Sequence, residues 1–359
     1  MDTSAVAHRP GPDDARELLA GAWFTIGFPP WGSAVLVALR ADAEPGLVAR
    51  VDLPRRLEHA RLIGDALANA ARQDGADAVV LVVVHGERAR RPPVLVRAER
   101  ALVRAAHAGL AHGGIGLADV LVVAGGRFRS VVCADPSCCP VEGRSLGDLR
   151  TTATGAALVL QGRTLAPSEE DLAADVRPEP WPRGTPAGPA LSPAAALERW
   201  RAMVADRVTC EVPPPDPVPG DVAWLVPALA DLGFRDAALV ALMPGAADLP
   251  DELVAGRGRS AAAWAAAEGT PPDRSLLEAG RALLAAVARG APAGSRAEAL
   301  ALLAWASWWQ GVGARARLLA ALALQDRPGH RLALIVDELL LRGVRPAWIR
   351  GVPTGREVP

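Results

Sequence analysis

The segment Ala78–Val84 is an unbroken apolar run, Ala-Val-Val-Leu-Val-Val-Val, rich in β-branched residues and followed by His85. Such a run is typical of a strand that is covered on both faces. The segments around it alternate between strand-like and helix-like spacing of apolar residues. They predict further strands at Ser33–Arg40, Leu47–Leu53, Leu117–Val123 and Arg127–Cys133, and helices at Pro12–Gly21, Pro54–Gln73 and Pro92–Gly109.

This order of elements predicts a hairpin, two strand-helix-strand units and a second hairpin. We expect three parallel middle strands with right-handed crossovers and antiparallel first and last strands at the edges. The fold class is therefore a three-layer α/β domain with a mixed, mainly parallel sheet. Asp52, His85 and Gly125 end strands at the carboxyl edge, where open α/β sheets usually bind ligands. The segment Pro29–Ser33 begins at that edge too, whereas Cys133 emerges at the opposite one.

The second half of the chain has a different pattern. Segment 176–193 contains six Pro and predicts a linker between an α/β domain, residues 13–175, and a helical domain, residues 194–350. The stretch Ser295–Pro328, with Gly311 at its turn, resembles a tetratricopeptide-type helical hairpin. The predicted helices are Ser192–Cys210, Asp221–Leu232, Ser260–Glu268, Ser275–Ala288, Ser295–Gln310, Ala314–Gln325 and Arg331–Arg342.

Composition narrows the range of functions. All 39 basic residues are Arg, since the sequence contains no Lys, and this excludes P-loop, pyridoxal-phosphate and protein-kinase chemistry. A net charge of −1 argues against a nucleic-acid or membrane-surface partner. The start of the chain lacks a signal-peptide pattern, no apolar run reaches spanning length, and Cys is sparse. We therefore expect a cytoplasmic protein with reduced thiols.

The most unusual local feature is the segment from Cys133 through Cys138-Cys139-Pro140. Clustered thiolates suit zinc, with His112 as the best candidate for a fourth ligand and Cys210 beyond the linker. Adjacent Cys138 and Cys139 are expected to have difficulty pointing at one ion. The alternatives are a redox pair of Cys133 with Cys138 or Cys139, and a compact turn that uses small thiols.

A second candidate site combines Asp52 and His85 at the carboxyl edge. A carboxylate can orient an imidazole that acts as a base or a metal ligand, and Glu87 is close in sequence. In the alternative interpretation Asp52 caps the helix that begins at Pro54, and His85 is an ordinary strand-end residue.

Other motifs carry weaker signals. Gly143-Arg-Ser145-Leu-Gly147 matches the hydrolase elbow, and His112-Gly-Gly resembles an oxyanion loop, but both lie in the wrong context and are expected to be chance matches. His59 is expected to be solvated on a polar helix face.

Two sets of residues are open to either a functional or a structural interpretation. Trp305, Trp308 and Trp309 share a helix face that either anchors a protein partner or packs into the core. Arg127 and Arg129 share one strand face that either binds an anion or keeps an edge strand solvated.

Several of these segments together resemble a known family. Ile26-Gly-Phe28, Arg50-Val-Asp-Leu-Pro54 and the Cys138-Cys-Pro turn, with Leu160-Gln-Gly-Arg163 and the helical tail around Trp305, are similar to the bacterial family of domain of unknown function 4192, DUF4192. The first loop differs, with Pro29 and Gly32 where the family commonly has a polar residue and an acid. The resemblance implies that Asp52 and the Cys-Cys-Pro turn belong to a recurring pattern, and it implies no activity.

The sequence favours a non-enzymatic regulatory or scaffold protein. In that hypothesis the α/β domain binds a small ligand and the helical domain binds a protein partner. One alternative is a thiol- or metal-dependent enzyme that uses Cys133, Cys138 and Cys139. The other is a hydrolase or nucleotide-binding enzyme at Asp52 and His85.

Overall fold

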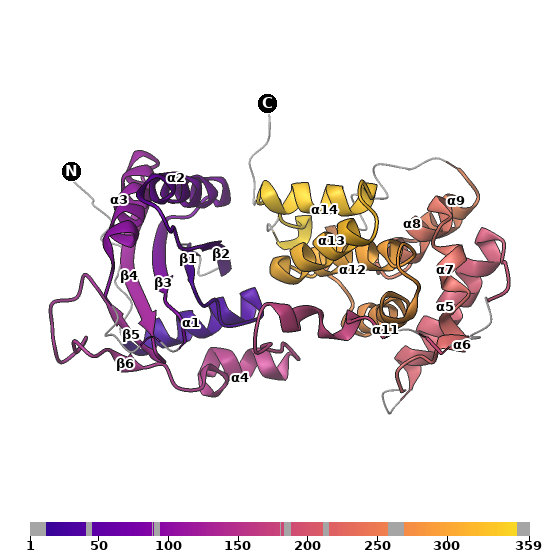
Figure 1. Cartoon of the computed structure of the whole chain (residues 1–359), viewed down its shortest axis with the longest axis horizontal. Helices are drawn as coiled ribbons and strands as arrows, with labels where there is room; N and C mark the ends of the chain where they lie inside the picture. Colours follow the sequence, from indigo (N-terminus) through magenta and orange to yellow (C-terminus); the bar gives the residue numbers. More distant parts are fainter. Residues whose placement is uncertain are drawn as a thin grey trace. The chain divides into compact units, whose positions relative to one another are not determined.

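The computed structural model describes residues 12–40, 45–87, 89, 94–179, 181–182, 188–210, 215–257 and 269–349. The chain divides into two compact units, Met1–Glu169 and Glu170–Pro359. In the described residues the first unit combines a sheet with helices, and the second is built from helices (Figure 1). The Pro-rich segment predicted as a linker falls in the second unit, and Val176 at its start is buried in that unit's core.

The sheet of the first unit is mixed and mostly antiparallel. Its strand order is β2-β1-β3-β4-β5-β6, and β3–β4 is the parallel pair, whereas β1 pairs antiparallel with both β2 and β3. The β4–β5 and β5–β6 pairs are antiparallel as well. The strands are β1 Ser33–Leu39, β2 Pro45–Asp52, β3 Ala78–Val84, β4 Gly116–Ala124, β5 Arg127–Ser130 and β6 Arg144–Ser145.

The prediction of a mainly parallel sheet is therefore wrong. β2, β3 and β4 do run in one direction, but β1 lies between β2 and β3 and is not an edge strand. The physical reason is burial: the residues of β1 before Leu39 are all buried, whereas those of β2 are half-buried or exposed. A strand that is apolar on both faces is stable when both of its edges are paired, so the more polar β2 occupies the edge. The two-residue strand β6, absent from the prediction, forms the other edge.

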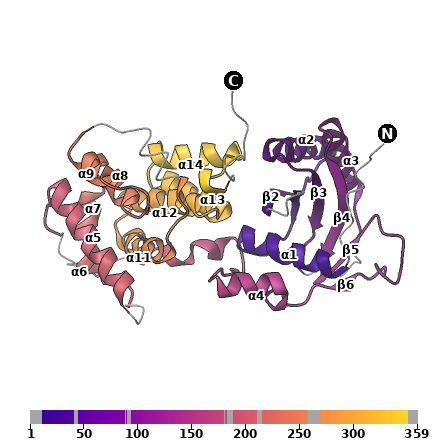
Figure 2. The ribbon, with the colours of Figure 1, turned by 180° about the vertical axis from the view of Figure 1, so that it is seen from behind.

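Helices cover the two faces of this sheet. Figures 1 and 2 place α2 and α3 on one side of the strands and α1 with α4 on the other. On the α2–α3 side, Leu67 and Leu102 pack against Leu36 and Leu81 in one apolar cluster. The helices are α1 Pro12–Ile26, α2 Leu57–Asp74, α3 Arg97–His112 and α4 Ala153–Leu160, with a short 3-10 helix at Leu149–Thr151.

The second unit is organised around α12, whose residues are all buried. The helix is apolar on all sides, and such helices are stable where other helices surround them. Trp305, Trp308 and Trp309 are 7%, 4% and 0% exposed, so they pack in the core and are not exposed anchors for a partner. The helices are α5 Pro193–Thr209, α6 Pro219–Val222, α7 Leu225–Ala228, α8 Leu232–Val240, α9 Leu249–Val254, α11 Arg274–Gly290, α12 Ala297–Trp309, α13 Gly313–Asp326 and α14 Arg331–Leu341, with 3-10 helices at Glu170–Val176 and Ala347–Ile349.

The predicted helix Asp221–Leu232 is broken into α6 and α7. Pro227 explains the break, because in a continuous helix its ring would clash with the carbonyl four residues earlier, at Ala223, which is the C-cap of α6. The predicted helix Ser260–Glu268 lies outside the described residues.

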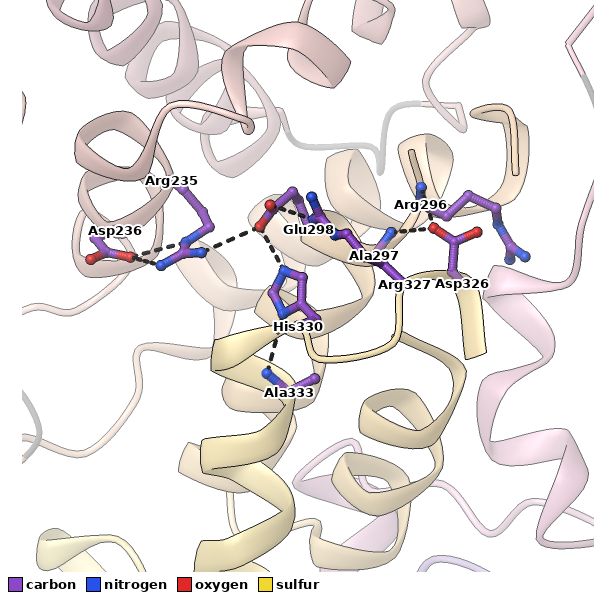
Figure 3. A network of polar contacts seen from close by, with 9 residues as sticks. All are labelled: Arg235, Asp236, Arg296, Ala297, Glu298, Asp326, Arg327, His330 and Ala333. Carbon is purple, nitrogen blue, oxygen red and sulfur yellow. Dashed lines mark hydrogen bonds and ion pairs between the residues drawn. The ribbon is translucent and has the colours of Figure 1, made fainter. Parts of the chain in front are cut away.

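A buried ionic network joins several of these helices (Figure 3). Glu298, in the first turn of α12, accepts from His330 at 2.8 Å and from Arg235 at 3.4 Å, and it also binds Arg327. Nδ1 of His330 accepts the backbone N–H of Ala333, so its other nitrogen carries the hydrogen directed at Glu298. Burial raises the pKa of the Glu298 carboxyl, but His330, Arg327 and Arg235 outweigh burial and lower this pKa to about 2.

We expect Gly64→Ala in α2 to lower the free energy of unfolding by about 1–3 kcal/mol through overpacking. A Cβ atom at Gly64 would lie 2.7 Å from the Cβ of Ala105 and 2.8 Å from backbone atoms of α3, which cannot move aside easily. Gly21→Ala in α1 is the matched control, because its new methyl would meet only Thr154 at 3.7 Å. Chemical denaturation should show this control unchanged or more stable by up to about 1 kcal/mol. Equal effects in the two variants would contradict the close packing of α2 on α3.

Glu298→Gln should lower the free energy of unfolding at pH 7 by about 1.5–3 kcal/mol, since it removes charge-assisted hydrogen bonds. The folded-state pKa is depressed, so the carboxylate stabilises the fold above about pH 4.5, and this contribution falls as the pH decreases toward 2. The difference between wild type and variant in chemical denaturation should therefore shrink between pH 5 and pH 3. Glu338→Gln, which disrupts an exposed pair with Arg342, is the control and should cost less than about 0.5 kcal/mol. A difference that stays constant with pH would contradict this role.

Candidate functional site

The three clustered cysteines lie in the connection between β5 and β6. β4 and β5 form a hairpin through Gly125 and Gly126, which have φ values of 53° and 71° and provide the left-handed turn that tight hairpins need. Arg127 pairs with Ala124, so β5 runs away from the edge at which β3 ends. The loop 131–143 then returns the chain to β6.

The sulfur atoms of Cys133, Cys138 and Cys139 all lie within 4.8 Å of one another. Cys138 Sγ and Cys139 Sγ are 3.8 Å apart. The adjacent pair was expected to have difficulty pointing at one ion, but its two sulfurs and that of Cys133 lie close enough together to hold one. Three converging thiols can bind a soft metal ion or exchange disulfides.

Cys133 is positioned by a buried pair of polar residues, Ser130 and Asp119. Ser130 Oγ donates to Asp119 Oδ1 at 2.6 Å and accepts the backbone N–H of Cys133 at 3.1 Å. Both residues are less than 5% exposed. The end of β5 is thereby fixed, and Cys133 begins the loop from a rigid point.

The other two cysteines are held by a turn and by one arginine. The carbonyl of Asp135 accepts the N–H of Cys139 at 2.7 Å, and the side chain of Asp135 accepts from Ser137. The Ser137 hydroxyl lowers the pKa of the Asp135 carboxyl. Arg144 in β6 donates to the carbonyl of Cys138 at 2.6 Å and to that of Ser137 at 2.9 Å. The backbone between the two strands is thus bound on both sides of the cysteine pair.

Arg127 and Arg129 also bind this loop. Arg127 donates to the carbonyls of Glu142 and Gly143 at 2.9 and 2.6 Å, and Arg129 reaches the carbonyl of Val141 at 3.4 Å. Of the two earlier interpretations, an anion site and a solvated strand face, neither describes these contacts. The two arginines act as backbone clamps for the end of the cysteine loop.

Mutual contact affects the acidity of the thiols. Hydrogen bonding to Cys139, burial and the proximity of Cys133 raise the pKa of the Cys138 thiol to about 11. A thiol with a raised pKa is a poor nucleophile at neutral pH. A bound cation reverses this effect, because metal ligation requires and stabilises thiolates.

The predicted fourth ligand does not join the cluster. His112 is exposed in the last turn of α3, where its Nδ1 contacts the carbonyl of Ala108 at 2.6 Å. Cys210 is exposed and belongs to the second unit. In the described part of the chain, the group of ligand atoms consists of the three sulfurs.

Asp52 and His85 lie at the same side of the sheet, where β2 and β3 end, but they do not form a pair. Ser33 of β1 pairs with Asp52 on one side and with Val84 on the other, so β1 separates the two side chains. Asp52 is exposed and accepts from Arg50 at 3.0 Å. It does not cap α2 either, because the helix begins at Leu57 and its N-cap residue has no side-chain hydrogen bond.

The partner of His85 is Glu99, which sequence reasoning missed. The His85 Nε2 atom lies 3.0 and 3.1 Å from the two carboxylate oxygens of Glu99. Glu99 also accepts the N–H of Val96 at 2.8 Å. An acid at the third position of a helix commonly binds back to the N-cap amide, and this pattern was the signal available in the sequence.

The surroundings of the remaining motifs do not fit the catalytic interpretations. Ser145 lies in β6, paired with Arg127, and not at a turn from strand to helix, as a hydrolase elbow requires. His112-Gly-Gly ends α3. His59 is exposed, as predicted, and Glu87 is exposed after the central strand.

Comparison with known proteins identifies one family. A family model described as "Domain of unknown function (DUF4192)" matches residues 16–347. No curated protein and no solved structure matches the chain. Among the helices in the described residues, none has the length and apolar character needed to cross a bilayer.

We expect Ser130→Ala to lower the free energy of unfolding by about 1–3 kcal/mol, because buried groups lose a hydrogen-bond partner. It should also speed the reaction of Cys133 with a small thiol reagent, since the Cys133 N–H loses its acceptor. Ser137→Ala is the control in the same loop, and its effect on unfolding should stay within about 0.5 kcal/mol because its partner Asp135 is exposed. Equal stability of the two variants would show that Ser130 does not anchor the loop.

Proposed function

The chain belongs to the DUF4192 family, and we propose that its N-terminal unit binds a thiophilic metal ion of the zinc class through Cys133, Cys138 and Cys139. The observation that carries this proposal is the convergence of three sulfurs within 4.8 Å. In a tetrahedral site with zinc–sulfur bonds of about 2.3 Å, two sulfurs lie about 3.8 Å apart. The Cys138–Cys139 separation of 3.8 Å matches that spacing.

The surroundings of the cysteines support a preorganised site. Ser130 holds the backbone of Cys133, and Arg144 holds the carbonyl of Cys138. Groups that orient metal ligands in this way commonly affect metal affinity by about 10–100-fold. The arginines near the loop also offset the negative charge that three thiolates bring to one divalent ion.

Three protein ligands leave one coordination position for water or for a ligand from outside the chain. Two valines of the loop, Val132 and Val141, are 58% and 63% exposed. An open metal position beside exposed valines suits reversible binding of a small ligand with one donor atom. We therefore propose a regulatory binding protein, in which the metal ion carries the ligand-binding position.

Recognition of a protein partner by the helical unit stays a prediction. The tryptophans that suggested it are buried, and α12 with α13 forms the helical hairpin predicted from the tetratricopeptide-like pattern. A partner surface on this unit would have to use residues other than Trp305, Trp308 and Trp309.

A second candidate function is thiol redox chemistry at the same cysteines. The observation that favours it is the presence of three cysteines outside disulfides whose sulfurs lie within 4.8 Å of one another, of which two can form a disulfide on oxidation. The two functions predict different results for metal content and for thiol count.

The metal proposal predicts that protein purified without chelator contains equimolar zinc, measured by elemental analysis. Cys133→Ser, Cys138→Ser and Cys139→Ser should each reduce the metal content strongly. Cys210→Ser is the matched control and should retain it, because Cys210 is exposed in the second unit. Cobalt substituted for zinc should give the absorption bands of cobalt–thiolate ligation in wild type and in the control.

Two outcomes would contradict the metal proposal. The first is a protein that contains no metal and gains none on dialysis against zinc or cobalt. The second is loss of two thiols on mild oxidation in a protein that binds no metal, which would support the redox function instead.

A further inference from the structure

α2 and α3 lie side by side, parallel and in register. A Cβ atom on Gly64 would lie 2.7 Å from the Cβ of Ala105, and one on Gly109 would lie 2.7 Å from the Cβ of Ala68. In both pairs the α3 residue follows its α2 neighbour by the same number of positions, so the register is constant along the helices. The N-terminal ends of the two helices therefore lie together.

This arrangement concentrates positive potential at one end of the helix pair. The N-terminal end of each helix carries a partial positive charge, and parallel neighbours place two such charges side by side. The side chains of the two N-cap residues, Arg56 and Val96, accept no hydrogen bond from a backbone N–H of the first turn. Amides that are left without an acceptor at a helix start are donors for an anion.

A cleft of about 290 Å³ opens between these helix ends. Its lining contains three guanidinium groups and one carboxylate, and the other lining side chains are apolar. No aromatic ring is among the lining residues, so the cleft offers no surface on which a base would stack. The residues are Leu57, Glu58, Arg61, Arg97, Ala101 and Arg104.

The arginines of the cleft differ from most others in the first unit. In the described residues, Arg127, Arg144 and other arginines of this unit bind carbonyls or carboxylates. Arg61, Arg97 and Arg104 have no hydrogen bond or ion pair with any described residue. Their donors remain directed to solvent and to the cleft.

The placement of these charges opposes local helix stability. Arg97 is the first residue of α3, where the helix dipole disfavours a cation. The acid of that first turn, Glu99, is buried and bound to His85, so it does not face the cleft to neutralise Arg97. Glu58 lines the cleft, but it is already paired with Arg56 at 3.4 Å. Residues that oppose the local electrostatic preferences of a helix in this way are found mainly at functional sites.

We propose that the cleft between the first two turns of α2 and α3 binds a small, multiply charged oxyanion of the phosphate class. Guanidinium groups bind phosphate oxygens with paired, geometrically matched hydrogen bonds. The volume lies at the lower end of the range for ligand pockets, which favours a diphosphate group over a complete dinucleotide. This site shares no residue with the cysteine loop.

The test is calorimetric titration of the full chain with inorganic pyrophosphate at low ionic strength in a phosphate-free buffer. The variant Arg61→Gln/Arg104→Gln should bind pyrophosphate at least about tenfold more weakly than wild type, because it loses two donor groups. The charge-matched control Arg72→Gln/Arg150→Gln removes two exposed arginines outside the cleft and should change the affinity less than about twofold. The melting temperatures of both variants without ligand should stay close to that of wild type, since all four side chains are exposed.

Three results would overturn the proposal. The first is a wild type that shows no heat and no thermal stabilisation with pyrophosphate. The second is an equal loss of affinity in the two double variants, which would indicate attraction by net charge. The third is binding of a short single-stranded oligonucleotide without binding of pyrophosphate, which would assign the surface to a polymer. A Cys133→Ser/Cys138→Ser/Cys139→Ser variant should keep its pyrophosphate affinity, so the anion site and the metal site are tested independently.

Discussion

The architecture of the first unit depends on the double pairing of β1. This strand is apolar on both faces, and its neighbours β2 and β3 bind both of its edges. Since β1 runs opposite to both, β2 and β3 are forced into the same direction, and each is followed by a helix that returns along the same face. The starts of α2 and α3 therefore meet at one edge of the sheet. The anion cleft is a direct consequence of that geometry.

Arginine performs most of the polar positioning in this protein. A guanidinium has donors in a fixed planar arrangement, so one side chain can bind two backbone carbonyls at once. Arg144 and Arg127 do this for the cysteine loop. In the second unit, Arg296 binds the carbonyls of Val176 and Ala288, and Arg315 binds the carbonyl of Leu172 and the carboxylate of Asp175. Loops without regular secondary structure are thereby given defined backbone positions. The three arginines of the cleft have no such partner among the described residues, and Arg55, Arg100 and Arg163 of the same unit share this property.

The two proposed sites use opposite electrostatics. The cysteine loop collects groups that become negative when they bind a cation, and its arginines are already occupied by carbonyls. The cleft is lined by positive groups. The acid of the α3 first turn, Glu99, does not neutralise them, because it is bound to His85 and to the Val96 amide. The buried His85–Glu99 pair thus links the central strand to the charge of the cleft.

The second unit obtains its order from a different source. α12 has no polar face, and apolar packing alone does not fix how such a helix is rotated among its neighbours. Glu298 at its start restricts the packing, since Arg235 of α8 and two residues of the α13–α14 connection, Arg327 and His330, meet at one carboxylate. Buried ionic groups that depend on one another in this way favour a unique arrangement.

The sequence by itself determined most of the longer elements and the common direction of β2, β3 and β4, but not β6 or the break between α6 and α7. Apolar runs and their periodicity located the core strands, because local burial is encoded in local pattern. The central strand Ala78–Val84 has the bounds that the pattern predicted. The cysteine segment could also be recognised from residue type alone. Three thiols in so short a segment are chemically unusual, whatever contacts they make.

Only the tertiary structure decided which strand lies beside which, and hence which side chains meet. Sequence order does not reveal that β1 separates Asp52 from His85, because strand pairing depends on competition between whole strands for burial. The shared register of α2 and α3 was invisible for the same reason, because it depends on contacts between segments far apart in the chain. The convergence of Cys138 and Cys139 with Cys133 is local, but it depends on side-chain orientations in an irregular loop, which residue spacing does not fix.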